Sequence, residues 1–421
     1  MKKRTLACLL AGILAVGSLA GCGKKEEQTS GAKTESGYAK NAKLKVWGSQ
    51  EDQEMYKKMI EEFQKENPEA ADWEIELAVV MGADAKTELL KDASAAADVF
   101  DFASDQVMEL QAANALYRIT KNKDEIIANN LDTAIQSASV DGELYGYPVA
   151  STTFLMFYDK SMYTEEEVKN LNTMMEKQLP EGVTNFSMDI DNGWYNSCFF
   201  QAAGCRLFGE DGTDPKSCDF NSEKGLLAGN YLADLAANPK FANQDGAVLL
   251  KAFENRTLGA TFTGGWDAEL IKGYLGDDYG VTKLPEVTFE DGTTAQLASM
   301  MNFNLTVVNA QTKYPAEAML LAEWMTNSDT ALQMRYEMRP VASTNKKMEE
   351  TIAADTENEA LKALTEQAQL SVLQTSIPQV ANFWTPTEAF GAGLMNQSIT
   401  RDNMQESLDT MVKNILSKLG E

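Results

Sequence analysis

KLKVWGSQED (residues 43–52) is the stretch that decides the fold, because it joins a strand to a helix through a polar turn. Residues 43–47 alternate between polar and apolar side chains, as a half-buried strand does. After the turn, apolar residues recur at helical spacing until Pro68 ends the pattern; they are Met55, Met59, Ile60 and Phe63. A strand that leads directly into a helix is the repeating unit of a layered α/β protein.

The alternation of strand and helix continues along the chain. We expect a helical stretch around 83–94 and strands at 73–80, 98–102, 153–160, 259–263, 279–285 and 302–309. Thr164 and Glu167 have the spacing of a capping box, which predicts a helix start. The last helix has one apolar face, made of Met404, Leu408, Met411, Val412, Ile415 and Leu419. Ligands of such sheets bind beyond the carboxyl ends of the strands, so we expect the functional residues there.

Composition predicts two lobes and excludes several classes of function. The chain has 421 residues, and no Gly/Pro-rich linker divides its body. With 63 acids and 37 bases its formal net charge is −26, which disfavours binding to nucleic acid or to anionic lipid. There is no histidine, no G-x-S-x-G and no Walker motif, so the common hydrolases, phosphoryl-transfer enzymes and most zinc sites are disfavoured. We expect no catalytic residue, no cofactor and no metal.

The N-terminal segment predicts export. Residues 1–21 have a basic start and a short apolar run, as a signal peptide does, and Leu19-Ala20-Gly21-Cys22 resembles a bacterial lipobox. Cys22 would then carry the lipid (palmitate-type) anchor, and residues 22–41 would form a polar, flexible tether. The alternative is an ordinary secretion signal with a cysteine at its cleavage site. The expected location is the extracellular face of the cytoplasmic membrane of a bacterium, of the Gram-positive type, with the lipid as the only membrane contact.

Three cysteines remain in the folded body. Cys205 and Cys218 flank the turn-forming segment GEDGTDP, which could bring them together as a disulfide and leave Cys198 as a free buried thiol. Three reduced thiols packed as small apolar groups are the alternative.

Aromatic residues follow several expected strands, next to polar side chains. Trp47 precedes the turn of Gln50, Glu51 and Asp52. The other candidates are Phe102 with Asp105, Trp194 with Tyr195, Trp266 with Asp267, and Trp384. Flat rings beside carboxylates and amides suit a pyranose, whose C–H faces stack on aromatics and whose hydroxyls need donors and acceptors. The alternative is a place in the core, which we adopt for Trp73 and Trp324 and which is as well supported as ligand contact for Trp47.

The chain resembles the extracellular solute-binding proteins that include the maltose/maltodextrin-binding proteins of ABC importers. The matching segments are KLKVWGSQED, EEFQKENPE, DVFDFASDQ, DGELYGYPVASTTFLMFYDK, FENRTLGATFTGGWD and IPQVANFWTPTEAFGAGLMNQSIT. The resemblance implies an α/β fold in the form of a two-lobed, periplasmic-binding-protein-like clamp with three hinge crossings. The N-terminal lobe would hold 42–150 and 302–327, and the C-terminal lobe 151–301 and 328–421.

The resemblance also implies roles for individual residues. The rings of Phe102, Tyr195, Trp266 and Trp384 would stack on successive glucose units, and Asp105 with the turn at 50–52 would bind hydroxyls. Three positions depart from the charged contacts of maltose binders; they are Gln106, Thr152 and Glu388. These exchanges leave the preferred length or linkage of the glucan open.

We therefore expect a monomeric, lipid-anchored receptor that captures malto-oligosaccharides and passes them to the permease subunits of an ABC importer. A receptor for a fructan, xylan or galactoside fragment is the nearest alternative. A surface glycan-degrading enzyme and a lipoprotein adhesin or scaffold are the alternatives from other classes.

Overall fold

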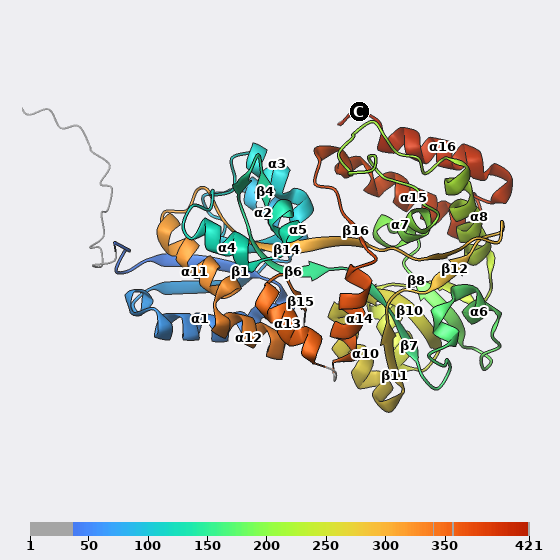
Figure 1. Cartoon of the computed structure of the whole chain (residues 1–421), viewed down its shortest axis with the longest axis horizontal. Helices are drawn as coiled ribbons and strands as arrows, with labels where there is room; N and C mark the ends of the chain where they lie inside the picture. The colour runs from blue at the N-terminus through green and yellow to red at the C-terminus, as the bar shows by residue number, and fades with distance from the viewer. Residues whose placement is uncertain (1–36, 340, 356–357, 420–421) are drawn as a thin grey trace, which may run out of the picture.

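The computed structural model describes residues 37–339, 341–355 and 358–419. These residues form two lobes that lie side by side in Figure 1, each with its own sheet and its own hydrophobic core. The predicted α/β class and the two-lobed form are confirmed. The expected signal peptide (1–21) and Cys22 lie outside the described residues.

The sheet of the N-terminal lobe combines strands from distant parts of the chain. Its order is β15-β6-β14-β3-β1-β2, with β16 beside β14. β1 is parallel to β2 and β3, whereas β14 is antiparallel to β3 and β6. The strands are β1 (Lys43–Gly48), β2 (Glu74–Val79), β3 (Val99–Ala103), β6 (Tyr147–Thr152), β14 (Met300–Val308), β15 (Ala342–Ser343) and β16 (Val372–Leu373). This lobe also contains a small hairpin, made of β4 (Ser139–Val140) and β5 (Glu143–Leu144). Its helices are α1 (Gln53–Glu66), α2 (Gly82–Lys91), α3 (Val107–Ala112), α4 (Lys123–Asn129), α5 (Asp132–Ser137), α11 (Pro315–Asn327), α12 (Asp329–Met338) and α13 (Lys346–Ala354).

The sheet of the C-terminal lobe has the order β11-β7-β10-β8-β9. Its strands are β7 (Phe154–Asp159), β8 (Thr184–Met188), β9 (Phe241–Asn243), β10 (Leu258–Gly264) and β11 (Tyr279–Thr282), and β12 (Glu286–Thr288) and β13 (Thr294–Gln296) form a separate hairpin. The helices of this lobe are α6 (Leu171–Glu176), α7 (Gly193–Ala202), α8 (Glu223–Ala237), α9 (Gly246–Glu254), α10 (Ala268–Leu275), α14 (Glu359–Ala368), α15 (Trp384–Met395) and α16 (Met404–Ile415). β8 is parallel to β9 and β10, so their carboxyl ends meet at one edge.

Buried hydroxyl groups join the segments that connect the lobes. Thr153 separates β6 from β7, and its hydroxyl lies 2.6 Å from the hydroxyl of Ser299, just before β14. The Ser299 hydroxyl is in turn 2.8 Å from that of Ser371, just before β16. The buried hydroxyls of Thr153 and Ser299 thereby have hydrogen-bond partners, and the half-buried Ser371 extends the chain of hydroxyls.

Two expected boundaries are wrong. The C-terminal lobe was expected to begin again at residue 328, but α12 packs on α1 and α11, and β15 pairs with β6 in the first sheet. The last lobe change therefore follows α13, because α14 packs on β7 and β11. The tether was expected to reach residue 41, but the backbone of Ala39 donates to Glu317 (2.6 Å) and accepts from the Trp73 indole (2.8 Å).

The tryptophans assigned to the core are confirmed there. Trp73 and Trp324 are buried, and both pack on Phe63 with ring centroids 5.9 and 5.7 Å away. The apolar face of the last helix is confirmed from Met404 to Ile415. Leu419 lies beyond the end of α16 and is exposed.

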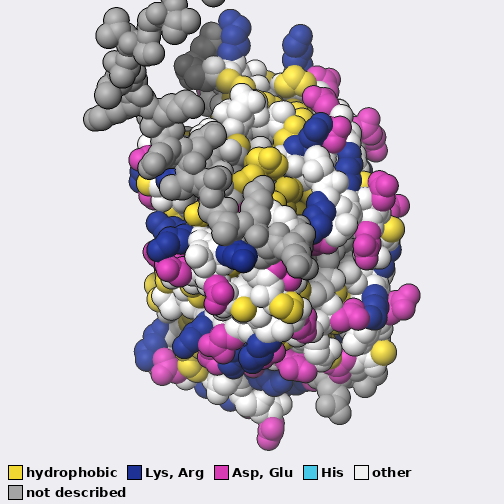
Figure 2. All heavy atoms as spheres, turned by 90° about the vertical axis from the view of Figure 1, so that its left-hand side faces the viewer, with side chains coloured by type: hydrophobic (Ala, Val, Ile, Leu, Met, Phe, Trp, Pro, Cys, Tyr) yellow, Lys and Arg dark blue, Asp and Glu magenta, His cyan; other side chains and the backbone are white. Residues whose placement is uncertain are grey.

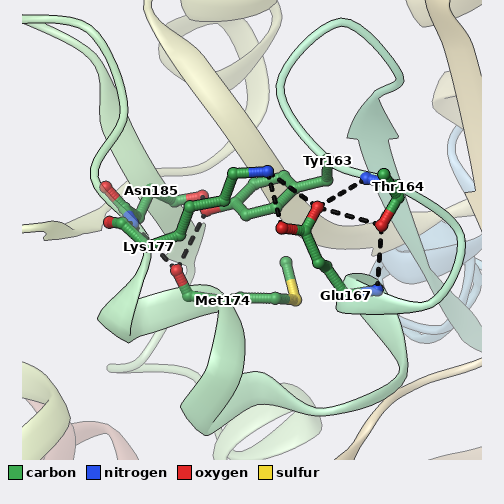
Figure 3. Close-up of polar contacts among 6 residues, drawn as sticks. All are labelled: Tyr163, Thr164, Glu167, Met174, Lys177 and Asn185. Carbon is green, nitrogen blue, oxygen red and sulfur yellow. Dashed lines mark hydrogen bonds and ion pairs between the residues drawn. The ribbon is translucent and has the colours of Figure 1, made fainter.

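The reciprocal hydrogen bonds of the capping box at Thr164 are confirmed, as Figure 3 shows, but the helix expected to start there is wrong, because only the short turn Glu167–Lys169 follows and α6 begins at Leu171. The backbone N–H of Thr164 donates to Glu167 (2.8 Å), and the N–H of Glu167 donates to the Thr164 hydroxyl (3.3 Å). Lys177 donates to both carboxylate oxygens of Glu167 at 2.7 Å. The bonds from Lys177 and then from Thr164 hold the pKa of Glu167 down to about 2.

Glu167→Gln is expected to lower the free energy of unfolding by about 1 kcal/mol at pH 7, because the ion pair is only partly buried. The native pKa of about 2 lies below the ordinary 4.5, so the carboxylate stabilises the fold above pH 4.5 and loses this effect as the pH falls toward 2. Urea unfolding at several pH values measures both effects. Glu166→Gln is the control, because its ion pair with Lys169 is mostly exposed, and an equal loss there would contradict the prediction.

The expected Cys205–Cys218 disulfide is wrong, because Cys198, Cys205 and Cys218 are all free and buried. The sulfur of Cys205 lies 3.9 Å from the Ser222 hydroxyl, and Cys218 pairs through its backbone with Leu207. Burial raises the pKa of Cys205 to about 11 and that of Cys218 to about 12, so both thiols stay protonated at neutral pH. The alternative of reduced, packed thiols holds.

The surface carries charges of both signs. Figure 2, which shows the end of the molecule formed by the N-terminal lobe, has Lys/Arg and Asp/Glu side chains intermingled, with no continuous basic patch on that face. Among the described residues, no helix has the length and apolar composition to cross a membrane.

Candidate binding cavity in the C-terminal lobe

A cavity of about 430 Å³ lies where three segments of the C-terminal lobe meet. α15 contributes Trp384 and Glu388. The remaining lining comes from the loop after β8 with the first residue of α7, and from the last residue of β9 with the loop after it. These residues are Asp189, Asp191, Asn192, Gly193, Asn243, Gln244 and Asp245. One indole among carboxylates and amides can stack on an apolar ring face and accept hydrogen bonds from hydroxyls.

The cavity wall depends on a close approach of two helices. Asn192 caps α7 by accepting from the N–H of Trp194 at 3.0 Å. The next residue must be small, because a Cβ on Gly193 would lie 2.3 Å from the Thr387 hydroxyl and 2.7 Å from the Phe383 ring. The glycine therefore lets the start of α7 rest directly on the first turn of α15, beside Trp384.

The carboxylates of the cavity are held by neighbouring amides. Asn192 donates to Asp189 (3.0 Å), and Asn243 donates to Asp191 (2.7 Å). Burial, with the nearby carboxyls of Asp191 and Asp245, raises the pKa of Asp189 to about 6. Despite this acidity, the described part of the chain has no group of three or more Cys, Asp or Glu residues placed to hold a metal ion.

Trp194 and Tyr195 lie in the first turn of α7, which follows β8, and Trp266 and Asp267 lie in the turn after the neighbouring strand β10. Tyr195 is only 9 % exposed and packs on Phe154, with ring centroids 4.8 Å apart, so its ring belongs mainly to the core. Its hydroxyl bonds to Thr263, whose own hydroxyl donates to Asp267 at 2.6 Å. The half-buried Trp194 is the more accessible ring of this pair.

Trp266 is 47 % exposed and follows β10 in the turn Gly265–Asp267. A Cβ on Gly264 would lie 2.1 Å from the indole, so the glycine allows the ring to fold closely over the backbone. Trp266 and Trp384 are thus the candidate rings with the clearest access to solvent or to a cavity.

In the N-terminal lobe, Asp105 and Gln106 lie in the turn that follows β3. Asp105 shares a buried polar cluster, since Gln374 bonds to it and accepts from Asn302 at 2.9 Å. Burial raises the pKa of Asp105 to about 6. Among the described residues, Asp105 Oδ1, Gln106 Oε1 and Asn302 Oδ1 have no hydrogen-bond partner. The half-buried Thr152 lies opposite Asn302 across β6 and β14.

The structure corrects the expected stacking role of Phe102. Its side chain is 1 % exposed and packs on Phe100, 6.1 Å away, in the core of the N-terminal lobe. Trp47 is likewise buried, 5.8 Å from Phe100, which favours the core alternative. An alternating strand pattern cannot tell which face of the strand is covered by helices, and here both rings point to the covered face.

The turn at residues 50–52 also differs from the expectation. Asp52 accepts from Ser49 (2.7 Å) and from Arg339 (2.9 Å), the residue that follows α12, so its carboxylate anchors the turn to the end of that helix. Gln50 and Glu51 are exposed and remain candidates for ligand contact.

Sequence reasoning missed several polar residues, both in the cavity at Trp384 and in the cluster around Asp105. Asp189, Asn192, Asn243 and Gln244 line the cavity, and Asn302 and Gln374 lie near the connections between the lobes. Asp189 and Asn192 could have been found, because the segment DIDNG follows a strand and precedes a helix. Asn243 and Gln374 carry no such signal, because Asn243 ends a strand of three residues and Gln374 follows a strand of two.

Comparison with known proteins gives a family match over most of the chain. Residues 58–363 match the bacterial extracellular solute-binding protein family. The galactooligosaccharide-binding protein of Bacillus subtilis (strain 168) is 29 % identical over 388 residues, which is 88 % of each chain.

Two solved structures show the same fold. One, a protein solved with acarbose, is 31 % identical, covers 89 % of this chain and 98 % of that chain, and has a TM-score of 0.81. The other is the maltodextrin binding protein MalE1 from L. casei BL23 without ligand, at 25 % identity, 90 % and 100 % coverage and a TM-score of 0.77. The match of the family model to residues 58–363 is in line with the two-lobed fold shared with these solved structures. This chain belongs to the bacterial extracellular solute-binding protein family.

Proposed function

We propose that this protein is an extracellular receptor for malto-oligosaccharides, which it delivers to an ABC importer. The observation that carries the proposal is the cavity at Trp384, where one indole stands among amides and carboxylates. Trp266, with its exposed ring, would supply a second stacking surface. A neutral sugar needs no basic site, and stacking on a ring adds about 1 kcal/mol beyond the burial itself.

The relatives support a sugar ligand of this kind. One solved relative was determined with acarbose, and another is called a maltodextrin-binding protein. Both resemble this chain over about nine tenths of its length. Binding without turnover is in line with these relatives, and we propose that the protein is not an enzyme.

A galactooligosaccharide receptor is the second candidate. It is favoured by the relative from Bacillus subtilis that bears this name and shares 29 % of its residues. The exchanged positions Gln106, Thr152 and Glu388 are where the two ligand classes would be distinguished, because they replace charged contacts of maltose binders.

Calorimetry tests the two candidates directly. Maltotriose and a longer maltodextrin are expected to bind with about micromolar affinity, near −8 kcal/mol. Galactotriose, lactose and raffinose are expected to give no heat. Heat from the galactosides alone would replace the proposed ligand with the second candidate, and release of reducing ends during incubation would indicate an enzyme.

Delivery would use closure of the lobes. A ligand that contacts both lobes only when they approach shifts the population toward the closed form. The permease subunits would then recognise the closed form, and a lipid on Cys22 would keep the receptor near them. Cys22→Ala is expected to release the protein from cell membranes into the medium, and unchanged membrane retention would argue against the lipid anchor.

Binding is expected to weaken by about threefold to tenfold between pH 7.5 and pH 5 if Asp105 accepts ligand hydroxyls. Its pKa of about 6 means that protonation removes the acceptor within this range. The free energy of unfolding of the ligand-free protein should instead rise as the pH falls, because protonation of a buried carboxyl with a raised pKa favours the folded state.

Calorimetry at several pH values checks this, with Asp105→Asn as the matched control. The asparagine variant should bind more weakly at pH 7.5 and show a flatter pH dependence. An equally steep dependence in the variant would assign the effect to another group, such as Asp189.

A further inference from the structure

The chain changes lobe abruptly just after β16. This strand touches the first sheet between α14 and α15, which both belong to the C-terminal lobe, and it lies near the junction of the lobes in Figure 1. The backbone N–H of Gln374 donates to the carbonyl oxygen of Met301 in β14 at 2.8 Å. The hydroxyl of the next residue, Thr375, donates to the carbonyl oxygen of Gly212 in the C-terminal lobe. We call the bond between Gln374 and Thr375 the pivot, because the contacts of the chain pass there from one lobe to the other.

The side chain of Gln374 is held in one orientation. It is only 7 % exposed, and its Oε1 accepts from the amide nitrogen of Asn302 at 2.9 Å. Its amide nitrogen donates to the carboxylate of Asp105. A carboxylate can only accept, so the amide must turn its nitrogen to Asp105 and its oxygen to Asn302. Both ends of the buried amide are therefore used, and turning it over would break both bonds.

The carboxyl of Asp105 has few other partners. It is half-buried in the turn after β3, in the N-terminal lobe. Among the described residues, Gln374 is the one side chain that donates a hydrogen bond to it. The charged side chains that act on it are Lys86 of α2 and Glu109 of α3, and these two form an ion pair with each other at 2.8 Å. Burial raises the pKa of Asp105 to about 6, whereas Lys86 and the bond from Gln374 lower it.

Beyond the pivot the same segment leads to the stacking ring of the cavity. Gln379 lies in the short helical turn Pro378–Asn382, which comes directly before α15 and Trp384. Its amide nitrogen donates to two carbonyl oxygens at and just after the end of α16, at 2.8 and 2.7 Å. The segment is thus fixed to the C-terminal lobe on this side. One short stretch of chain therefore connects the partner of Asp105 in one lobe with Trp384 in the other.

We propose that Gln374 is a positioning residue for ligand binding, which holds the Asp105 carboxylate in place from the pivot between the lobes. The inference rests on the proposed function, in which Asp105 accepts hydroxyls of the sugar, and it adds a residue that acts through Asp105 without touching the sugar. Rotation of the lobes turns the backbone at the pivot. The position of the acceptor in one lobe is thereby linked to the orientation of the other.

Gln374→Met tests the inference, because methionine keeps the length of the side chain and removes both hydrogen bonds of the amide. Calorimetry with maltotriose between pH 5 and pH 8 gives the midpoint of the expected fall in affinity. Loss of a donor to the ionised form raises a carboxyl pKa, so the midpoint should move upward by about half a pH unit. At pH 8, where Asp105 is ionised in both proteins, the affinity should still fall about threefold through loss of position.

Gln379→Met is the matched control, because it removes a buried glutamine of the same segment whose bonds lie within the C-terminal lobe. It should lower the melting temperature without moving the midpoint. An equal shift in both variants, or no shift in Gln374→Met, would overturn the inference. If Gln374→Met does not fold, Asn302→Leu removes the group that orients the amide and should move the midpoint in the same direction, and an unchanged midpoint there would count against the inference equally.

Carbon-13 NMR of the Asp105 carboxyl separates this inference from the proposed function. The signal is assigned by its absence in Asp105→Asn, and it is titrated without any ligand. Its midpoint should rise by about half a pH unit in Gln374→Met and stay in place in Gln379→Met. If maltotriose does not bind to the parent protein, the receptor proposal fails, and an unchanged carboxyl titration in Gln374→Met overturns the role of Gln374 whether or not the sugar binds.

Discussion

Replacing Trp384 with alanine is expected to weaken malto-oligosaccharide binding by about thirtyfold or more, because truncating a central aromatic residue of a binding site costs about 2 kcal/mol or more. The indole is the aromatic wall of the 430 Å³ cavity, and without it a sugar ring loses both stacking and burial of its apolar face. Trp266→Ala should act in the same direction. Its effect should be smaller if its half-exposed ring binds only an outer glucose unit.

Calorimetry with maltotriose measures these losses, and Trp384→Phe is the control because it keeps a flat ring at the same place. The phenylalanine variant should retain most of the affinity. Thermal melting without ligand must be similar in all variants, since Trp384 is only half-buried and packs on Phe383 at 5.0 Å. Unchanged affinity in both alanine variants would refute the stacking surface and, with it, the proposed receptor.

Much of the fold could be predicted because short-range patterns set it. The strand at 43–47, the helix after it and the capping box at Thr164 all follow from spacing and from side-chain chemistry within a few residues. The place of α12 could not be predicted in this way. Its place beside α1 depends on contacts between residues far apart in the sequence, such as that of Arg339, just after α12, with Asp52, just before α1.

The candidate site was predicted only in part, for a similar reason. Trp266 and Trp384 were found because each was expected in a loop beside polar side chains, and because the resemblance assigns a stacking role to both. Phe102 has the same local setting, but its neighbour Phe100 and the helices over β3 enclose it. Exposure is a property of what packs on a residue, and a single sequence does not give it.

The close contact between α15 and the loop after β8 leads to the second large prediction. Gly391→Ala is expected to lower the free energy of unfolding by about 3 kcal/mol, through overpacking. A Cβ on Gly391 would lie 2.2 Å from the carbonyl oxygen of Ile190 and 2.4 Å from the Cα of Asp191. Both are backbone atoms, so relief requires the helix or the loop to move. Because this loop carries Asp189 and Asp191 of the cavity, the variant should also bind malto-oligosaccharides more weakly.

Gly273→Ala in α10 is the matched control, because a Cβ there would meet nothing within 4 Å. Alanine is favoured over glycine inside a helix by about 1 kcal/mol, so this variant should be slightly stabilised and should keep its affinity. Urea unfolding and calorimetry of both variants separate the helix propensity from the clash, since the propensity favours alanine at each position. If Gly391→Ala were stabilised as well, α15 would not be held against the loop as closely as the fold requires, and Trp384 would lose its fixed place beside Asp189.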